Sequence, residues 1–549
     1  MTDQSFLKLL ASSIQNNWER PAFSNYMSET YTYGQFAERI VQVHLILKAT
    51  GVKPGDKVAI IGRNSAGWAM DFFGIISYGC VAVPILHDFK PASVQHIVKH
   101  SDAKVLFVAN SVWENLDIAE LNHLSLILLI NDLKKLYTSI PALDKSDICN
   151  ELLKKNYPNG VCFEDLKFHK EDPESLVMLS YTSGTSGFSK GVMIPWRALW
   201  SNVRFGLDST VPFEPGTDTI SMLPMAHMYG LAFEVCTEVC CGVHVHFLTR
   251  TPSPRIIAET FKKYSPILIV AVPLIMEKIV RKQIFPMLDN KRYKFLRHIP
   301  VVRECINSTI CQKLKEGFGG KFYEIIVGGA AFSPDVESFL KQINFPYTVG
   351  YGMTECAPLI TYSDWKVFKE GSVGKAIPRM EIRIDSVDPE NVVGEIQVRG
   401  TSVMKGYYHN EEATKNAFTD DGWMRTGDLG TIDAEGNLFI RGRSKNMLLG
   451  PNGQNIYPEE IECQLNVYPY VGESIVVSRD EKLVALIHPD LEAMDRDGIP
   501  LSGVNKLMQE NIDELNKELP AYCRLSSFQI FQEEFEKTPK RSIKRYLYQ

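Results

Sequence analysis

The chain contains 549 residues, of which 45% are hydrophobic, 10% aromatic and 23% charged. This composition is that of a large globular protein, and it excludes a single small module or a long disordered chain. The 59 basic and 65 acidic residues give a formal net charge of −6. The charge balance therefore indicates no nucleic-acid partner, and any basic site must be local.

The cysteines and the apolar segments indicate a protein that stays inside the cell. The eleven cysteines form no CxxC pair and have no histidines at zinc spacing, which is typical of reduced cytoplasmic thiols. The N-terminal residues lack the pattern of a secretion signal. The longest apolar stretches, 124–130 and 266–276, are shorter than the roughly 20 residues of a membrane-spanning helix. We expect a cytoplasmic protein without an integral membrane segment, while peripheral membrane contact and a homodimer stay open.

The first half of the chain alternates between predicted strands and helices. Residues 51–85 combine a Pro-Gly turn, the apolar run VAII, a helical stretch and a second apolar run, VAVPI. A helix over 91–100 and a strand over 104–110 continue the pattern, which returns in the runs PILIVAVP and YEIIVGGA. This repeated βαβ order predicts mostly parallel sheets covered by helices.

The pattern changes from Gly371 onward. Short alternating strands such as EIRIDSV and GEIQVRG predict a small antiparallel or barrel-like β subdomain. The glycine-rich stretch 436–455 predicts a hinge. The strands SIVVS and LVALIHP and a helix over 504–518 follow it. We therefore predict an α/β protein with a large N-terminal domain over 1–440 and a small mobile α+β domain over 441–549.

The strongest local signal is YTSGTSGFSKG at residues 181–191, which follows the apolar strand SLVMLS. Its three glycines let backbone N–H groups approach an anion, and Lys190 adds a cation. Four hydroxyl side chains can donate hydrogen bonds to phosphate oxygens: Thr182, Ser183, Thr185 and Ser186. The spacing is not GxxxxGK[ST] of the kinase and GTPase P-loop, because Ser189 stands where that pattern has glycine. The pattern predicts a polyphosphate-binding loop, with a ligand-free helix-capping loop as the alternative.

Seven motifs, this loop included, resemble the adenylate-forming superfamily of acyl-CoA synthetases, luciferases and peptide synthetases, whose loop signature is YTSGTTGxPKG. In the loop, Ser186 replaces a threonine and Ser189 a proline. The other six follow in the family's order: LPMAHMYG at 223–230, GGAAFSPDV at 328–336, GYGMTE at 350–355, WMRTGDLG at 423–430, GRSKNMLLGPNGQNIYPEEIE at 442–462 and a terminal TPKRSIKR. The chain is thereby identified as a member of this superfamily, most like the long-chain fatty acid CoA ligases.

Several of these motifs contain side chains that a nucleotide site needs. Tyr351, between two glycines, offers an aromatic face for a purine, and Thr354 can donate to an α-phosphate. Glu355 supplies a hard oxygen ligand for Mg²⁺. Each residue also has an ordinary structural interpretation when it is taken alone. Tyr351 can be a core tyrosine and Glu355 a surface charge. Asp428, in the TGD turn at 426–428, can be an ordinary turn residue.

The resemblance implies a role for each motif. Thr182 and Glu355 share Mg²⁺, Asp428 binds the ribose hydroxyls and Arg443 faces the phosphates. His227 closes over the carboxylate site, although a histidine in an apolar run is also typical of a protein core. The nucleotide-binding set implied in this way is Thr182, Ser183, Gly184, Thr185, Ser186, Gly187, Lys190, Gly329, Ala330, Ala331, Tyr351, Gly352, Met353, Thr354, Asp428, Arg443 and Lys445.

The implied substrates are ATP with Mg²⁺, a fatty acid and coenzyme A. A carboxylate resists attack by a thiol because its leaving group would be oxide, whereas transfer of AMP creates a good leaving group and releases pyrophosphate. Positioning and charge neutralisation at the α-phosphorus carry this step. The C-terminal domain then swings about Lys445 for thioester formation. The apolar run after His227 and the segment VPLIMEKI at 272–279 favour a medium- or long-chain acid, but the run equally suits a buried helix and strand.

One position departs from the family pattern. The signature TxxGKIxR places a lysine on the acyl carboxylate and α-phosphate, whereas this chain has Ser542 there. On an extended segment Lys540 and Lys544 would share the face of Ser542, so we expect one of them to act catalytically beside His227 and Lys190. A solvated basic tail is the alternative. Two other functions stay open: an acyl-AMP ligase that loads a carrier protein, and a nucleotide-binding protein with weakened adenylation.

Overall fold

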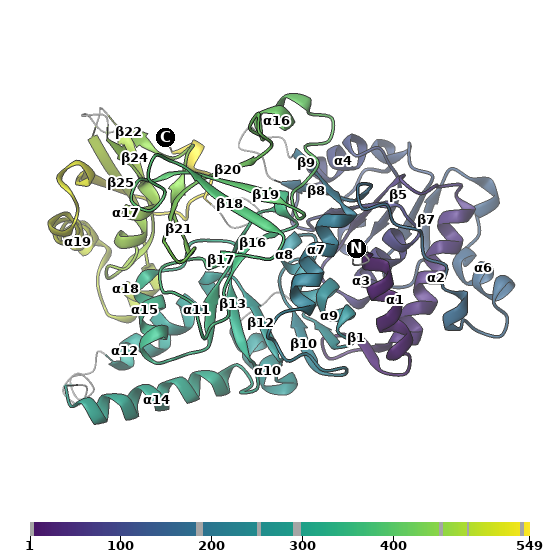
Figure 1. The fold of residues 1–549 in the computed structure, drawn as a ribbon, viewed down its shortest axis with the longest axis horizontal. Coiled ribbons are helices and arrows are strands. Elements are labelled where there is room, and N and C mark those ends of the chain that lie inside the picture. Colours follow the sequence, from purple (N-terminus) through teal and green to yellow (C-terminus); the bar gives the residue numbers. More distant parts are fainter. Residues whose placement is uncertain are drawn as a thin grey trace.

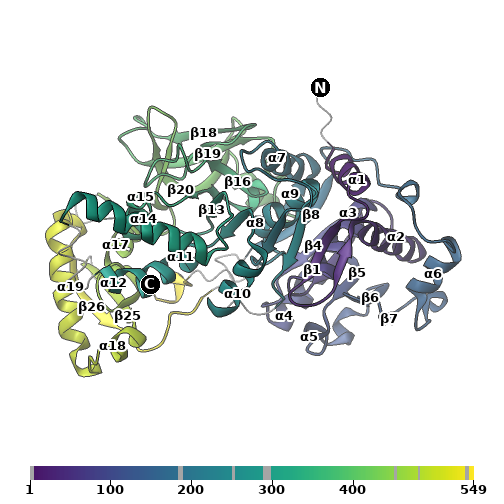
Figure 2. The ribbon, with the colours of Figure 1, turned by 90° about the horizontal axis from the view of Figure 1, so that it is seen from below.

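The computed structural model describes residues 5–182, 190–249, 254–288, 298–449, 454–479, 482–537 and 543–548. In Figure 1 the N-terminal sheet and its helices lie on one side of the molecule and the C-terminal elements α17, α19, β24 and β25 on the other. The sheet of β18–β21 lies between them. Figure 2 shows the same order of parts from below.

The largest sheet has seven strands in the order β7-β6-β5-β3-β4-β8-β9. Its strands are β3 (Lys57–Ile61), β4 (Val81–Ile85), β5 (Ala103–Val108), β6 (Leu126–Leu129), β7 (Lys135–Thr138), β8 (Leu176–Thr182) and β9 (Lys190–Pro195). The five inner strands are parallel, and β7 and β9 pair antiparallel at the edges. The βαβ unit predicted over 51–85 is confirmed: α3 (Ala66–Ser77) joins β3 to β4, and all of its residues are buried.

Two smaller sheets complete the N-terminal layers. One has the order β10-β11-β1-β2, from β1 (Pro21–Asn25), β2 (Thr30–Thr32), β10 (Asp218–Ser221) and β11 (His244–Phe247). The other has three parallel strands, β12 (Leu268–Ala271), β13 (Glu324–Val327) and β14 (Tyr347–Val349). In the apolar run 266–276 the strand ends before Pro273, because proline has no N–H for a sheet ladder and instead begins α11 (Pro273–Ile279).

Helices alternate with these strands along the chain. They are α1 (Phe6–Asn16), α2 (Tyr33–Ala49), α4 (Pro91–His100), α5 (Asn110–Trp113), α6 (Ile148–Asn156), α7 (Trp196–Leu207), α8 (Met228–Leu231), the π-helix η4 (Ala232–Cys236), α9 (Thr237–Cys240), α10 (Pro254–Tyr264), the π-helix η5 (Val280–Ile284), α12 (Phe285–Leu288), α14 (Pro300–Gly317), α15 (Pro334–Gln342) and α16 (Glu411–Asn416). The helix predicted over 91–100 is confirmed as α4. The strand predicted over 104–110 ends at Val108, because Asn110 begins α5.

The second half contains antiparallel sheets, as predicted from the short alternating strands. A three-stranded sheet has β15 (Tyr351–Gly352), β16 (Leu359–Tyr362) and β17 (Lys375–Ala376). A four-stranded sheet has β18 (Met380–Asp385), β19 (Gly394–Gly400), β20 (Met424–Ile432) and β21 (Leu438–Arg443). The short pair β22 (Leu448–Leu449) and β23 (Asn455–Ile456) follows.

The C-terminal residues have their own buried core. β24 (Val471–Arg479), β25 (Lys482–Pro489) and β26 (Leu525–Ile530) form one sheet. Its apolar side chains pack with α17 (Pro458–Leu465), α18 (Leu491–Arg496) and α19 (Val504–Glu518). The helix predicted over 504–518 is confirmed. The predicted fold class, an α/β protein with parallel sheets followed by antiparallel strands and a small α+β unit, is therefore confirmed. None of the described helices is long and apolar enough to cross a membrane.

Candidate functional site

The loop with the strongest sequence signal joins two antiparallel strands, β8 and β9. Thr182 and Lys190 face each other at the end of this hairpin. Ser183, Gly184, Thr185, Ser186 and Gly187 lie outside the described residues, so only the base of the loop is placed. The loop follows a buried strand, as predicted: five of the seven residues of β8 are buried. Four of the five residues before Tyr181 are apolar, which explains this burial.

A second segment, residues 404–408, lies along β9 and brings an aromatic ring to Lys190. The backbone N–H of Tyr408 donates to the Gly191 carbonyl over 2.8 Å, which fixes the segment against the strand. The Lys190 ammonium group lies 4.8 Å from the centre of the Tyr407 ring. The Tyr407 hydroxyl in turn donates to Glu355 Oε1 over 2.9 Å. Lys190 and Glu355, which are 165 positions apart, are thus linked through one tyrosine.

Tyr407 is a residue that the sequence did not single out. Burial raises its pKa, and the nearby Glu355 carboxylate raises it further, so its hydroxyl stays a hydrogen-bond donor at neutral pH. Glu355 itself is 9% exposed in the short turn that follows β15. Its carboxylate and the Thr182 hydroxyl are oxygen donors of the kind that Mg²⁺ prefers. The donor set therefore fits Mg²⁺.

Tyr351 and Arg443 meet at the carboxylate of Asp428. Asp428 and Arg443 are opposite each other on β20 and β21, and Arg443 Nε lies 3.0 Å from Asp428 Oδ1. The Tyr351 hydroxyl donates to the other oxygen, Oδ2, over 2.6 Å. Burial raises the pKa of Asp428, while Arg443 and the Tyr351 hydroxyl oppose that shift. Three predicted site residues from distant motifs therefore form one hydrogen-bonded group.

The Tyr351 ring is more enclosed than a free stacking platform, because only 8% of the residue is exposed. Its neighbour Gly352 is exposed and Met353 half-buried, whereas Thr354 is 9% exposed. Each oxygen of Asp428 already accepts one hydrogen bond, and each carboxylate oxygen has a second lone pair for a ligand. The group therefore retains acceptor capacity while holding Tyr351 and Arg443 in place.

The segment that contains Gly329, Ala330 and Ala331 follows β13 and is exposed. It begins at Gly328, whose N–H donates to the Ala271 carbonyl over 3.1 Å. Gly329 has φ = +86°, a conformation that strongly favours glycine. This segment and Tyr351 both lie just beyond the carboxyl ends of parallel strands, the edge at which ligands bind in open α/β sheets.

His227 is half-buried and immediately precedes α8. The segment before it is anchored by Glu234, whose Oε2 accepts the N–H groups of Met222 over 3.0 Å and Leu223 over 2.9 Å. Burial raises the pKa of Glu234 well above its usual range, against the hydrogen bonds from this backbone and from Ser221. Glu234 is a charged residue in the apolar run after His227. The structure shows it as a buried anchor for the His227 segment.

A narrow apolar cavity of about 30 Å³ lies behind the His227 segment. Its wall includes the apolar Phe205, Phe233 and Ile326 and the polar Glu324 and Tyr362. The Tyr229 ring also lines the cavity, and its hydroxyl donates to the Ile326 carbonyl over 3.2 Å. The run after His227 thus contributes both to a buried helix and to a cavity wall. A larger open cavity of about 1050 Å³ along α14 is lined by none of the predicted site residues.

The terminal lysines are placed only in part. Lys544 forms an ion pair with Glu536, and Lys540 and Ser542 lie outside the described residues. Lys537 and Ile543 form an antiparallel bridge. The expectation that Lys540 and Lys544 share one face of an extended segment falls on residues outside the described part of the chain.

Lys445 is exposed and lies two residues after β21. The turn around it is closed by Ser444, whose N–H donates to the Gly427 carbonyl over 3.0 Å. Asn446 then donates to Glu459 on α17. Lys445 thus lies between the sheet that contains Asp428 and the C-terminal elements.

This fold and the convergence of these motifs define an adenylate-forming enzyme. The chain belongs to the AMP-binding enzyme family, whose sequence pattern matches residues 10–408, and residues 446–548 match the AMP-binding enzyme C-terminal domain. It is 29% identical to the peroxisomal long chain acyl-CoA synthetase 7 of Arabidopsis thaliana, over 84% of this chain and 69% of that protein. It is 25% identical to a long-chain-fatty-acid–CoA ligase of Escherichia coli O6:H1, over 93% of this chain and 94% of that protein.

Solved structures share the same fold. The anthranilate CoA ligase AuaEII in complex with anthranoyl-AMP superposes with a TM-score of 0.78 at 20% identity, over 99% of this chain and 96% of that one. The o-succinylbenzoate CoA synthetase MenE of Bacillus subtilis, in complex with ATP and magnesium ion, has a TM-score of 0.75 at 21% identity, with 98% of each chain covered. These likenesses confirm the large N-terminal and small C-terminal architecture.

Proposed function

We propose that this chain activates a medium- or long-chain fatty acid with ATP and transfers the acyl group to coenzyme A. The observation that carries the proposal is that predicted site residues from distant motifs form two hydrogen-bonded or stacked groups. Lys190, Tyr407 and Glu355 form one linked group, and Tyr351, Asp428 and Arg443 form another. Residues 351–355 join the two groups. Together they offer cations, hydroxyls and carboxylates in the combination that a magnesium-bound nucleotide requires.

In the first step a carboxylate oxygen of the acid attacks the α-phosphorus of ATP. The bond from that phosphorus to the bridging oxygen breaks, and pyrophosphate leaves with the electron pair. Lys190 and Arg443 neutralise phosphate charge, and Asp428 holds the ribose. Thr182 and Glu355 would hold Mg²⁺, which would further offset the phosphate charge. Catalysis in this step rests on positioning and electrostatics.

In the second step the coenzyme A sulfur attacks the acyl carbon, and AMP leaves with the electron pair of the broken C–O bond. The thiol proton passes to solvent. We assign the two parts of the chain to residues 1–440 and 441–549, with rotation about Lys445 between the two steps. The exposed position of Lys445, between β21 and α17, supports this assignment.

The fatty acid is favoured by the apolar cavity behind His227 and by the names of the curated relatives. At about 30 Å³ the cavity is only water-sized, so an acyl chain enters as side chains of its wall move apart. We propose a gating role for His227, because it lies two residues before Tyr229, which lines the cavity.

Pyrophosphate exchange tests the proposal across fatty acids of graded length, with benzoate and anthranilate as aryl controls. We expect exchange with the fatty acids and thioester formation when coenzyme A is added. Exchange confined to the aryl acids would overturn the choice of substrate. Exchange without thioester would favour loading of a carrier protein, and ATP binding without exchange would favour a nucleotide-binding protein with weakened adenylation.

A further inference from the structure

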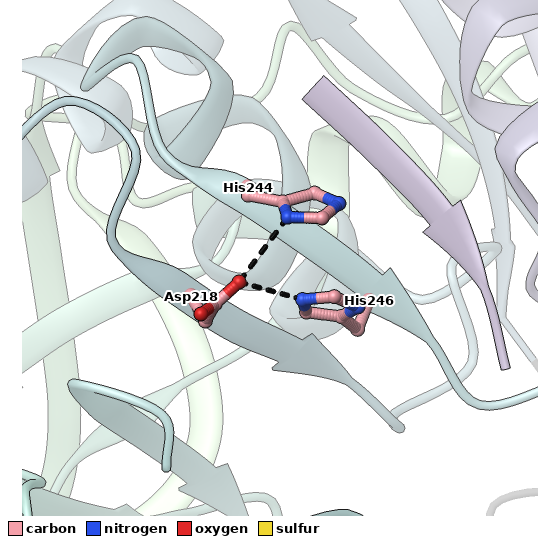
Figure 3. Close-up of side chains that lie close together, drawn as sticks. All are labelled: Asp218, His244 and His246. Atoms are coloured by element: carbon pink, nitrogen blue, oxygen red, sulfur yellow. Dashed lines mark hydrogen bonds and ion pairs between the residues drawn. The ribbon is translucent and has the colours of Figure 1, made fainter. Parts of the chain in front are cut away.

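Three side chains with metal-ligating atoms converge on the small sheet of β10, β11, β1 and β2. Asp218 on β10 pairs with His244 on β11, and His246 lies two residues farther along the same strand. Since alternate residues of a strand share one face, both imidazoles lie on the same face of the sheet. Figure 3 shows the Asp218 carboxylate pointing to both rings from the adjacent strand. None of the predicted nucleotide-site residues is part of this group.

The three ligand atoms meet at one carboxylate oxygen. Asp218 Oδ1 lies 3.2 Å from His244 Nδ1 and 2.7 Å from His246 Nε2. All three atoms lie within 4.8 Å of one another. A tetrahedral Zn²⁺ with ligands at roughly 2.0–2.1 Å holds its ligand atoms about 3.3 Å apart. The two separations from Asp218 Oδ1, 3.2 and 2.7 Å, are therefore within about 0.6 Å of the value that such an ion requires.

The surroundings of the group hold the first histidine in a ligating orientation. His244 Nε2 lies 2.7 Å from Ser24 Oγ, so its ring is oriented by a hydroxyl on the side away from Asp218. Metal-bound histidines are usually oriented in this way through their second nitrogen. The His246 ring stacks on Tyr264 with centroids 3.7 Å apart. The Asp218 side chain is 40% exposed, which leaves a path for an ion and a position for water.

We propose that Asp218, His244 and His246 form a binding site for a divalent transition-metal ion such as Zn²⁺. Imidazole nitrogens favour zinc and similar ions over Mg²⁺, which prefers oxygen ligands. The site has three protein ligands, and water fills the fourth position. The ion joins β10 to β11 by bonds stronger than the present hydrogen bonds. Because β10 leads directly into the segment anchored by Glu234, the ion also fixes the base of that segment.

Equilibrium dialysis of the full chain against Zn²⁺ tests the site. The chain is first treated with a chelator, and excess Mg²⁺ is present throughout to occupy oxygen-only sites. We expect one tightly bound ion per chain. His244→Gln and Asp218→Asn should each weaken binding at least tenfold, and Ser24→Ala should weaken it about 10- to 100-fold. His123→Gln, at an exposed histidine elsewhere, is the matched control and should bind as the wild type does.

If a histidine variant fails to fold, the Zn²⁺ affinity of Asp218→Asn tests the site instead. This variant should fold, because Asp218 is partly exposed and asparagine has nearly the same shape. Circular dichroism establishes that the variant is folded. Substitution with Co²⁺ supplies an independent readout, and the absorption spectrum should show nitrogen and oxygen ligands only. The proposal is overturned by absent stoichiometric binding, by unchanged affinity in folded Asp218→Asn, or by a thiolate-to-cobalt band, which would indicate cysteine ligands.

Discussion

Tyr407 and Tyr408 are adjacent residues whose hydroxyl groups make different contacts. Tyr407 donates to Glu355 over 2.9 Å, whereas Tyr408 donates to Asp102 over 2.8 Å. A hydrogen bond to a charged group is worth about 1.5–3 kcal/mol. We therefore expect Tyr407→Phe to lower kcat/KM for ATP by about tenfold or more, because Glu355 loses its orienting partner. Pyrophosphate exchange at varied ATP and fixed acid measures the change.

Tyr408→Phe is the matched control for that experiment. It removes the same atom one residue away but leaves Glu355 untouched, so kcat/KM for ATP should stay within about twofold of the wild type. Equal losses in the two variants would mean that the whole 404–408 segment had shifted. That result would contradict the specific role of Tyr407.

Glu234 anchors the backbone before His227 because its carboxyl oxygen accepts hydrogen bonds, and we expect this role not to require a negative charge. Burial raises its pKa well above the usual range. Glu234→Gln keeps an oxygen for the N–H groups of Met222 and Leu223, so we expect near-normal stability and exchange activity. Glu234→Ala leaves one buried and one part-buried donor without this acceptor and should lower the free energy of unfolding by about 2–4 kcal/mol. Urea denaturation measures this difference, and a glutamine variant as unstable as the alanine variant would refute it.

At the scale of single elements, Glu337 couples α15 to the turn at Gly371. It is 5% exposed and accepts the Gly371 N–H over 2.9 Å. Burial raises its pKa to about 7 from an ordinary 4.5. A group with a raised folded-state pKa stabilises the fold fully below its unfolded pKa and loses that contribution as the pH rises through the folded pKa. The window for Glu337 is therefore about pH 4.5 to 7.

Glu337→Gln removes this dependence. Relative to the wild type, its free energy of unfolding should rise by about 2–3 kcal/mol between pH 5 and 8, because only the wild type must bury a charge at the higher pH. Denaturant titrations at the two pH values measure the difference. Glu412→Gln, at an exposed carboxylate of α16, is the control and should show a constant difference from the wild type. A constant difference for Glu337→Gln as well would contradict the raised pKa.

The terminal segment offers two lysines for the position that Ser542 leaves without a cation. Lys544 is already paired with Glu536, so we propose Lys540 as the lysine that acts. We expect Lys540→Ala to reduce pyrophosphate exchange strongly, by up to about a thousandfold if one charge at ~4 Å is lost in the transition state. Lys544→Ala should reduce it only a few-fold. If neither variant loses more than a few-fold, the terminal lysines take no part in adenylation.

At the scale of the whole molecule, local patterns predicted more of the fold than of the site. The βαβ unit around α3 and the helix α19 followed from apolar periodicity, because that periodicity reflects which face each element buries. The sequence identified the motifs that contain Tyr351, Asp428 and Arg443, but it did not predict the contacts that these three side chains make with one another. Tyr407 and Glu234 were missed as partners, since a contact between residues far apart in the chain leaves no mark on sequence spacing.

The apolar cavity exists only in the assembled molecule, because its wall comes from α7, α8, β12, β13 and β16. Gly328 directly follows β13 and lies against Tyr229, whereas Glu324, four residues earlier, is the first residue of the same strand. At about 3.3 Å per residue, the two positions are roughly 13 Å apart along the strand. Glu324 accepts a hydrogen bond from Tyr362 and lines the cavity. From the spacing along the strand we infer that it closes the end of the cavity farther from the nucleotide groups. Burial raises its pKa to about 7.

Removing this closure should change the length of acid that the proposed enzyme accepts. Glu324→Ala makes room for about two more methylene groups, each worth roughly 0.8 kcal/mol, so kcat/KM for longer acids should rise about tenfold relative to shorter ones. Glu324→Gln keeps the volume and should keep the wild-type preference. Exchange assays over acids of graded length measure both ratios. If alanine and glutamine behave alike while exchange itself persists, the acyl chain does not reach Glu324, and its site lies elsewhere in the N-terminal part.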